Sequence, residues 1–262
     1  MLQVLAAVSI PVAVVIVGSI FTASQSRSQQ QAEEQRAQAQ QAIEEQRAQD
    51  EALQGYLNEM GGLLIDEDLQ SSRPTDEVTI LARARTVTIL SRVDARRKAS
   101  IFKFLNDAGL IDKKKSDTVL FGESVATDHS VVSIKNADFS GVRISSDDIT
   151  DNDFKTLDLS GVNLTKADLR EIHLGKDDLS NANLSGADLS EAFLNESDLR
   201  SANLSEADLS EARLVEADLS NADLSGADLS GAFLHKATIA DEQLAEASSL
   251  ENATMPDGSK HD

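Results

Sequence analysis

The chain has 262 residues, a formal net charge of −21 and no cysteine, and only 3 % of its residues are aromatic. This length allows one or two domains, and the lack of cysteine excludes disulfides, thiolate metal sites and thiol nucleophiles. So few aromatic residues make a hydrophobic ligand pocket a poor prospect. The acidic balance disfavours direct binding to nucleic acid and favours basic partners.

Residues 2–21 form an apolar run without a charged residue. A helix of this length, at about 1.5 Å per residue, spans roughly 30 Å, the thickness of a bilayer core. A signal peptide is the alternative, but the basic segment that begins such peptides is missing. The nearest basic residues, Arg27 and Arg36, follow the run. The run therefore predicts a transmembrane anchor over residues 1–24 of a single-pass cell-membrane protein with a cytoplasmic C-terminal bulk.

Residues 25–70 predict a helical stalk, because good helix formers make up almost all of its first half. The sequence EEQRAQ occurs at Glu33 and again at Glu44. This shift of eleven residues suits a straight or right-handed coiled coil, and a solvated single helix is the alternative.

Residues 71–115 predict a short helical bundle, with a break at Pro74 and a last helix from about Asp94 to Asp107. The expected inward residues of that last helix are Ile101, Phe102 and Leu105. The expected buried face of the helix before it is Ile80, Ala84, Val87, Leu90 and Val93. Residues 73–115 carry eleven Lys/Arg against five Asp/Glu. These basic residues can contact lipid head groups, face solvent, or dock on the acidic half of the chain.

A repeat of five residues follows the connector that we expect over residues 116–133. From Phe139 to Ile239 every fifth residue is Leu, Ile or Phe, and a small residue, usually Ala, stands two places earlier. Helices and flat strands have periods of 3.6 and 2, so neither buries this pattern. A chain that turns a quarter circle per unit points every leucine at one axis, with coils stacked about 4.8 Å apart. The pattern predicts a β-solenoid over residues 134–240.

The repeating unit, A-[DN]-L-x-x, resembles the pentapeptide-repeat family over residues 132–243. The resemblance implies an all-β right-handed quadrilateral β-helix, preceded in this chain by the membrane helix and the helical stalk and bundle. The flanks, such as QDEALQGYLNEMGGLLIDEDL, are similar to a bacterial subgroup that places a membrane helix and a helical module before the repeats. The resemblance also implies that residues 241–262 are a helical cap and tail over the open end of the coil.

With four units per coil, residues twenty apart are expected to stack, and the position before each leucine gives four columns. The first aspartate ladder is Asp138, Asp158, Asp178, Asp198 and Asp218. The second aspartate ladder, on the opposite side, is Asp148, Asp168, Asp188, Asp208 and Asp228. The asparagine column is Arg143, Asn163, Asn183, Asn203 and Asp223. The fourth side begins with Asp153 and continues as the aromatic column, which is His173, Phe193, Arg213 and Phe233.

The aspartates are expected to accept backbone N–H bonds at the corners. The aromatic column breaks the polar rule and is the candidate surface for a partner or for a second copy in a homodimer. No G-x-S-x-G, phosphate loop or His/Asp/Glu cluster is present, so neither catalysis, nor a cofactor, nor a metal site is expected.

These patterns predict a membrane-tethered, non-enzymatic scaffold that presents an acidic rod to an unidentified, basic protein partner. The resemblance implies an alternative, because some members of the family mimic nucleic acid: a DNA-mimic inhibitor of a DNA-binding enzyme such as a type II topoisomerase. Residues 137–246 hold eight Lys/Arg against twenty-four Asp/Glu, a net charge of −16. On a rod of about 26 Å this is one charge per roughly 1.6 Å, close to the roughly 1.7 Å of duplex DNA.

Overall fold

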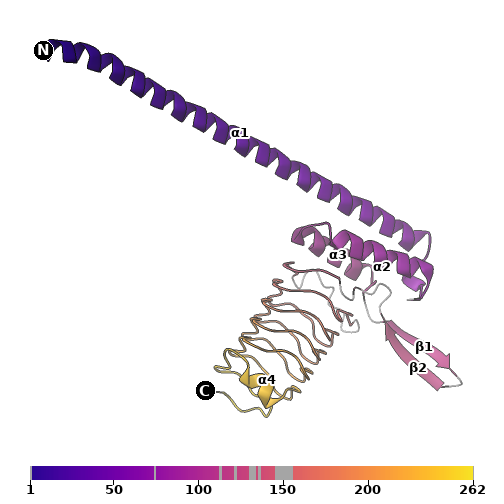
Figure 1. Ribbon diagram of the computed structural model, residues 1–262. Helices are drawn as coiled ribbons and strands as arrows, with labels where there is room; N and C mark the ends of the chain where they lie inside the picture. The colour runs from indigo at the N-terminus through magenta and orange to yellow at the C-terminus, as the bar shows by residue number, and fades with distance from the viewer. Residues whose placement is uncertain are drawn as a thin grey trace. The chain divides into compact units, whose positions relative to one another are not determined.

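The computed structural model describes residues 2–73, 75–111, 114–120, 123–129, 134, 137–144 and 156–261 (Figure 1). Of these residues, only the backbone is described for 2–24, 26–28, 114–120 and 123–129. The elements in chain order are α1 (Leu2–Ile65), η1 (Leu69–Ser71), α2 (Glu77–Leu90), α3 (Ala95–Asp107), β1 (Lys114–Leu120), β2 (Glu123–His129) and α4 (Asp241–Ala245). The chain divides into two compact units, residues 1–50 and 51–262.

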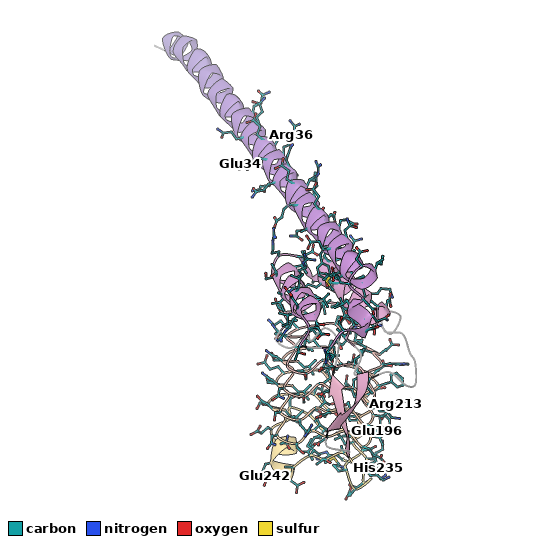
Figure 2. All side chains as sticks on the ribbon, turned by 90° about the vertical axis from the view of Figure 1, so that its right-hand side faces the viewer. Glu34, Arg36, Glu196, Arg213, His235 and Glu242 are labelled. Atoms are coloured by element: carbon teal, nitrogen blue, oxygen red, sulfur yellow. The ribbon has the colours of Figure 1, made fainter. Side chains whose placement is uncertain are left out.

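In the first unit, α1 runs without a break through the predicted anchor and into the predicted stalk (Figure 1). From residue 29 to residue 51 nearly every side chain is exposed, and Glu34 and Arg36 point away from the helix (Figure 2). Among the described residues, no helix has the length and apolar character needed to cross a membrane. This finding contradicts the predicted membrane location. The side chains of residues 2–21, which carried that prediction, lie outside the described residues.

In the second unit, the end of α1 packs against α2 and α3. Tyr56 Oη and Thr86 Oγ1 are hydrogen-bonded at 2.9 Å in this buried layer. Burial raises the pKa of the Tyr56 phenol to about 12.

The predicted buried face of α2 is wrong in part. Thr79, Ala82, Thr86 and Ile89 are buried, whereas Ile80 is 58 % exposed. Of the other predicted residues, Ala84 and Val87 are also exposed, and Leu90 and Val93 are buried as expected. The reason is that both faces of α2 carry apolar and β-branched residues, so hydrophobic periodicity alone does not select one. The Tyr56 hydroxyl favours the face with a threonine, since a buried hydroxyl needs a hydrogen-bond partner.

Helix α3 closes the N-terminal end of the repeats. The Asp94 carboxylate caps this helix by accepting the Arg97 backbone N–H at 3.0 Å. Ile101, Phe102 and Leu105 are buried, as predicted. The Phe102 ring meets the Phe139 ring of the first coil edge-on, with centroids 5.7 Å apart. The helices and the coils therefore share one hydrophobic core.

One basic residue of α3 docks on the acidic half of the chain. Lys98 is 7 % exposed, and its Nζ lies 2.8 Å from Asp138 Oδ2. Desolvation opposes ionisation of Asp138, but hydrogen bonds from Lys98 and Ser140 outweigh it and lower the pKa of this carboxyl. For Lys98, the third of the three predicted alternatives is therefore confirmed.

The segment after α3 contains a β-hairpin where we expected only a connector. Strands β1 and β2 pair antiparallel, with Lys114 opposite His129 and Leu120 opposite Glu123. The apolar residues of this segment are too few to give the alternating pattern that predicts a strand.

The repeats form stacked coils, as the five-residue period predicts. Along the coils each side contributes one residue to a parallel bridge, for example Asp188 with Asp208. Backbone bonds join the coils, and Leu189 N–H donates to Asp208 O at 2.7 Å. Every central leucine from Leu159 to Leu234 is at most 2 % exposed. These leucines form one dry column along the axis.

Every described corner between Phe139 and Ala237 repeats one turn. In the turn that begins at Leu184, Ala187 N–H donates to Leu184 O at 3.0 Å, and Gly186 has φ 62°. The equivalent corner residues from residue 141 to residue 236 have φ between 56° and 71°, and many are glutamates. A positive φ at the third residue alone is the feature of a type II turn.

The predicted register is wrong in the first coil. Asp138 pairs with Asn163 and Arg143 pairs with Asp168, which is a separation of 25 residues instead of 20. Asp138 therefore begins the asparagine column, and Arg143 precedes the second aspartate ladder. Five additional residues leave the five-residue period intact, so the sequence pattern cannot reveal this shift. The predicted positions at 148 and 153 lie outside the described residues.

At the other end, α4 covers one side of the last coil. Gln243 Nε2 donates to Leu219 O at 2.8 Å and to Ala222 O at 2.7 Å, which satisfies two carbonyls at the open edge. The predicted helical cap is shorter than expected, because the chain then returns to the coils. Ser249 and Thr254 form parallel bridges to Asp228 and Phe233.

Candidate protein-interaction surfaces

The aspartate ladders are built from the turns. In the first ladder, Asp178 Oδ1 accepts the Ser180 backbone N–H at 2.9 Å, and in the second, Asp208 Oδ1 accepts the Ser210 N–H at 3.0 Å. Each carboxylate thus satisfies a corner N–H, which is the structural role expected from the sequence. The bridges stack residues of each ladder one coil apart: Asp158, Asp178, Asp198 and Asp218; Asp168, Asp188, Asp208 and Asp228.

Arginines neutralise part of both ladders. Arg170 Nε lies 2.9 Å from Asp168 Oδ1 and 3.4 Å from Asp188 Oδ2, so it bridges two coils. The bond from Arg170 is the largest cause that lowers the pKa of the Asp168 carboxyl to about 2. In the first ladder, the bond from Arg200 lowers the pKa of Asp198 in the same way. The remaining ladder aspartates keep the surface acidic.

The aromatic column is continuous over four coils. Parallel bridges join His173 to Phe193, Phe193 to Arg213, and Arg213 to Phe233. The His173 and Phe193 rings meet with centroids 4.4 Å apart at 66°. The Arg213 guanidinium carbon lies over the Phe193 ring, 4.8 Å from its centre. These side chains therefore form one stacked surface.

A hollow of about 500 Å³ lies at the end of this column, lined by Asn195, Arg213, Val215 and Phe233. Phe233 is 43 % exposed, so part of its side chain is open to solvent beside the hollow. Figure 2 shows Arg213, together with Glu196 and His235, on one side of the coils.

Asn195 and Val215 belong to this surface, although the sequence did not single them out. On the ladder sides the residue after each leucine is mostly serine, and its N–H is bound by an aspartate. On this side Val215 N–H donates instead to Asn195 Oδ1 of the preceding coil, at 3.2 Å. The sequence could have indicated these two residues, because both positions depart from the serine that is usual after the leucine.

The comparisons agree with this geometry. The family model described as pentapeptide repeats matches residues 178–214 and 202–239, with eight copies. A pentapeptide-repeat protein from Nostoc PCC 7120 is 30 % identical, and the match covers 43 % of this chain and 84 % of that one, with a TM-score of 0.32. The chain belongs to the pentapeptide-repeat family. Membership implies a right-handed β-helix, as the resemblance led us to expect.

Other solved structures are similar to this pentapeptide-repeat protein. HetL from Nostoc sp. strain PCC 7120, involved in heterocyst differentiation regulation, is 32 % identical, with 48 % of this chain covered and a TM-score of 0.22. The match spans 65 % of HetL, just under two thirds of its length. A pentapeptide-repeat protein of the Arabidopsis thaliana thylakoid lumen is 26 % identical, with 43 % and 71 % covered and a TM-score of 0.22. No curated protein matches the chain. The family model covers repeats only, so the predicted membrane-anchored subgroup is not supported.

Proposed function

We propose that this pentapeptide-repeat protein is a non-catalytic scaffold whose aromatic column binds a protein partner. The observation that carries the proposal is that one side of the coils, and only one among those described, replaces Asp or Asn by His173, Phe193, Arg213 and Phe233 over four successive coils. Since the leucine axis does not require these residues, their grouping is best explained by contact with another molecule.

The aspartate ladders favour a partner that is basic elsewhere on its surface. Residues 137–246 have a net charge of −16, which speeds encounter with a basic protein. Screened surface charges add little affinity by themselves, whereas buried aromatic anchors often dominate it. The coils hold the column in place by backbone bonds, so little ordering is required on binding.

The test compares two variants of the full-length protein as baits in an extract of its source cells. Phe193→Ser with Phe233→Ser removes both rings, and we expect captured partners to fall by at least about tenfold, which is about 1.4 kcal/mol. Glu191→Ser with Glu211→Ser is the matched control, because Ser201 occupies the equivalent corner with φ 57°. The control should capture partners as the parent does, and neither variant should unfold. Unchanged capture by the double Phe variant would refute the proposal.

A DNA-mimic inhibitor remains the second candidate, since the two aspartate ladders run along opposite sides of an acidic rod. It predicts that Asp188→Asn with Asp208→Asn weakens binding while the double Phe variant does not. It also predicts that the parent inhibits a type II topoisomerase in a supercoiling assay. These two results together would refute the scaffold proposal and support the DNA-mimic proposal.

A further inference from the structure

Arg213 differs from the other arginines of the described coils. Arg143, Arg170 and Arg200 each donate to a ladder aspartate at 2.6 to 2.9 Å. Arg213 forms no ion pair with any residue that the structure describes, and its guanidinium is stacked on the Phe193 ring. Stacking uses the flat face of a guanidinium and leaves the N–H groups at its edge available for an acceptor.

The carboxylates of the adjacent corner are already occupied. Lys236 Nζ lies 2.8 Å from Glu216 Oε1, and Lys176 Nζ lies 3.7 Å from Glu196 Oε1. At this corner each of these two carboxylates is therefore paired with a lysine. The corner on the other side of the column carries Glu191 and Glu211, and no ion pair joins Arg213 to either of them within the described residues.

An apolar surface lies directly next to Arg213. Phe233 and Val215 line the same hollow as Arg213, and its volume of about 500 Å³ accommodates a short peptide segment with one large side chain. The fourth lining residue, Asn195, already uses its Oδ1 to accept the Val215 N–H. The hollow thus combines one aromatic wall with one guanidinium.

We infer that the aromatic column takes a protein segment in which one aromatic side chain stands next to one carboxylate. The ring packs against Phe233 and Val215, and the carboxylate accepts hydrogen bonds from Arg213. The inference rests on the proposed function and specifies its partner. A segment rich in carboxylates is excluded by the aspartate ladders of the neighbouring sides. A partner with this one pair of an aromatic and an acidic residue, and with a basic surface elsewhere, complements both the aromatic column and the aspartate ladders.

The test uses three blocked tetrapeptides as probes: acetyl-Gly-Phe-Asp-Gly-amide and the same peptide with Asn or Lys in place of Asp. Each is titrated into the full-length, isotope-labelled protein, and the NMR signals of Arg213 Nε–H and the Val215 methyls are followed. We expect the Asp peptide to bind about fivefold more tightly than the Lys peptide, with the Asn peptide between them. Arg213→Gln should remove the preference. Arg200→Gln, on the first aspartate ladder, should preserve it.

Equal binding of the three peptides, no binding up to roughly 10 mM, or an unchanged preference in Arg213→Gln overturns the inference. Concentration-dependent shifts of the same signals without peptide identify a second copy as the occupant and also overturn it. None of these results affects partner capture by the double Phe variant. Failure of the peptide test alone therefore leaves the proposed function standing, whereas unchanged capture by that variant refutes the proposed function itself.

Discussion

Substitution of Glu191 tests the turn geometry at a position where the side chain itself does almost nothing. Glu191 is exposed, and its backbone has φ 59°. Surface substitutions usually change stability by less than about 0.5 kcal/mol. Here the backbone conformation, not the loss of a contact, sets the effect of each substitution.

The magnitude follows from the left-handed conformation. This conformation costs an L-residue roughly 1–2 kcal/mol, and Glu191 already bears part of that cost. Glu191→Lys should be nearly neutral, because Lys166 and Lys176 occupy equivalent corners with positive φ. Glu191→Val should lose about 1 kcal/mol more, because a β-branched side chain crowds the backbone at positive φ. Glu191→Gly relieves the strain, but the greater freedom of the unfolded chain offsets about 0.5–1 kcal/mol of that gain.

The assay combines urea denaturation with hydrogen exchange, because neighbouring repeats of a solenoid can open separately. The Glu191 N–H, bonded to Ser210 O at 2.8 Å, reports the local opening. A loss of about 1 kcal/mol corresponds to roughly fivefold faster exchange of this amide in the Val variant. If the Val and Lys variants agree within about 0.3 kcal/mol, the turn assignment is refuted.

Two further predictions concern the axis and the ladders. Leu209→Ala should lower the free energy of unfolding by about 3–4 kcal/mol, because Leu209 is fully buried and a cavity remains; a urea midpoint like that of Glu191→Lys would contradict this. Arg170→Ala should raise the pKa of Asp168 from about 2 towards its ordinary 3.8, as measured by carboxyl ¹³C titration, and an unmoved pKa would refute the Arg170 bond as its cause. Because the folded pKa is depressed, the bond stabilises the protein above about pH 4. The difference between parent and variant should disappear as the pH falls towards 2.

The sequence predicted the coils because a period of five leaves only one way to bury the leucines. The regularity of this period also explains why the register shift in the first coil was missed. An extra five residues between the first and second coils leave the period unchanged, so the placement of Asp138 and Arg143 could not be read from it. The face of α2 was missed for the opposite reason: both faces are apolar enough, and the hydroxyl of Tyr56, far away in the sequence, decides between them.

For the predicted surfaces too, the sequence predicts what depends on local turns and misses what depends on packing between coils. The bonds of the ladder aspartates to corner N–H groups follow from local turn chemistry, which the sequence contains. The stacking of Arg213 on Phe193 and the hollow beside Phe233 depend on residues twenty positions apart. Once the register is fixed, such neighbours can be assigned to one column, but whether an arginine meets a carboxylate or a ring depends on side-chain packing between coils.

The aromatic column also shows how the surface can change without loss of the coil. A residue other than Asp or Asn before the leucine leaves the corner N–H of that turn without its usual acceptor, and an unsatisfied buried N–H is costly. Asn195 resolves this at one corner by accepting the Val215 N–H from the next coil. At this corner the residue after the leucine of one coil takes over the role of the residue before the leucine of the next coil, so Arg213 is not needed as the acceptor. At Arg213 the surface therefore rests on two linked positions, with Asn195 after the leucine of one coil and Arg213 before the leucine of the next.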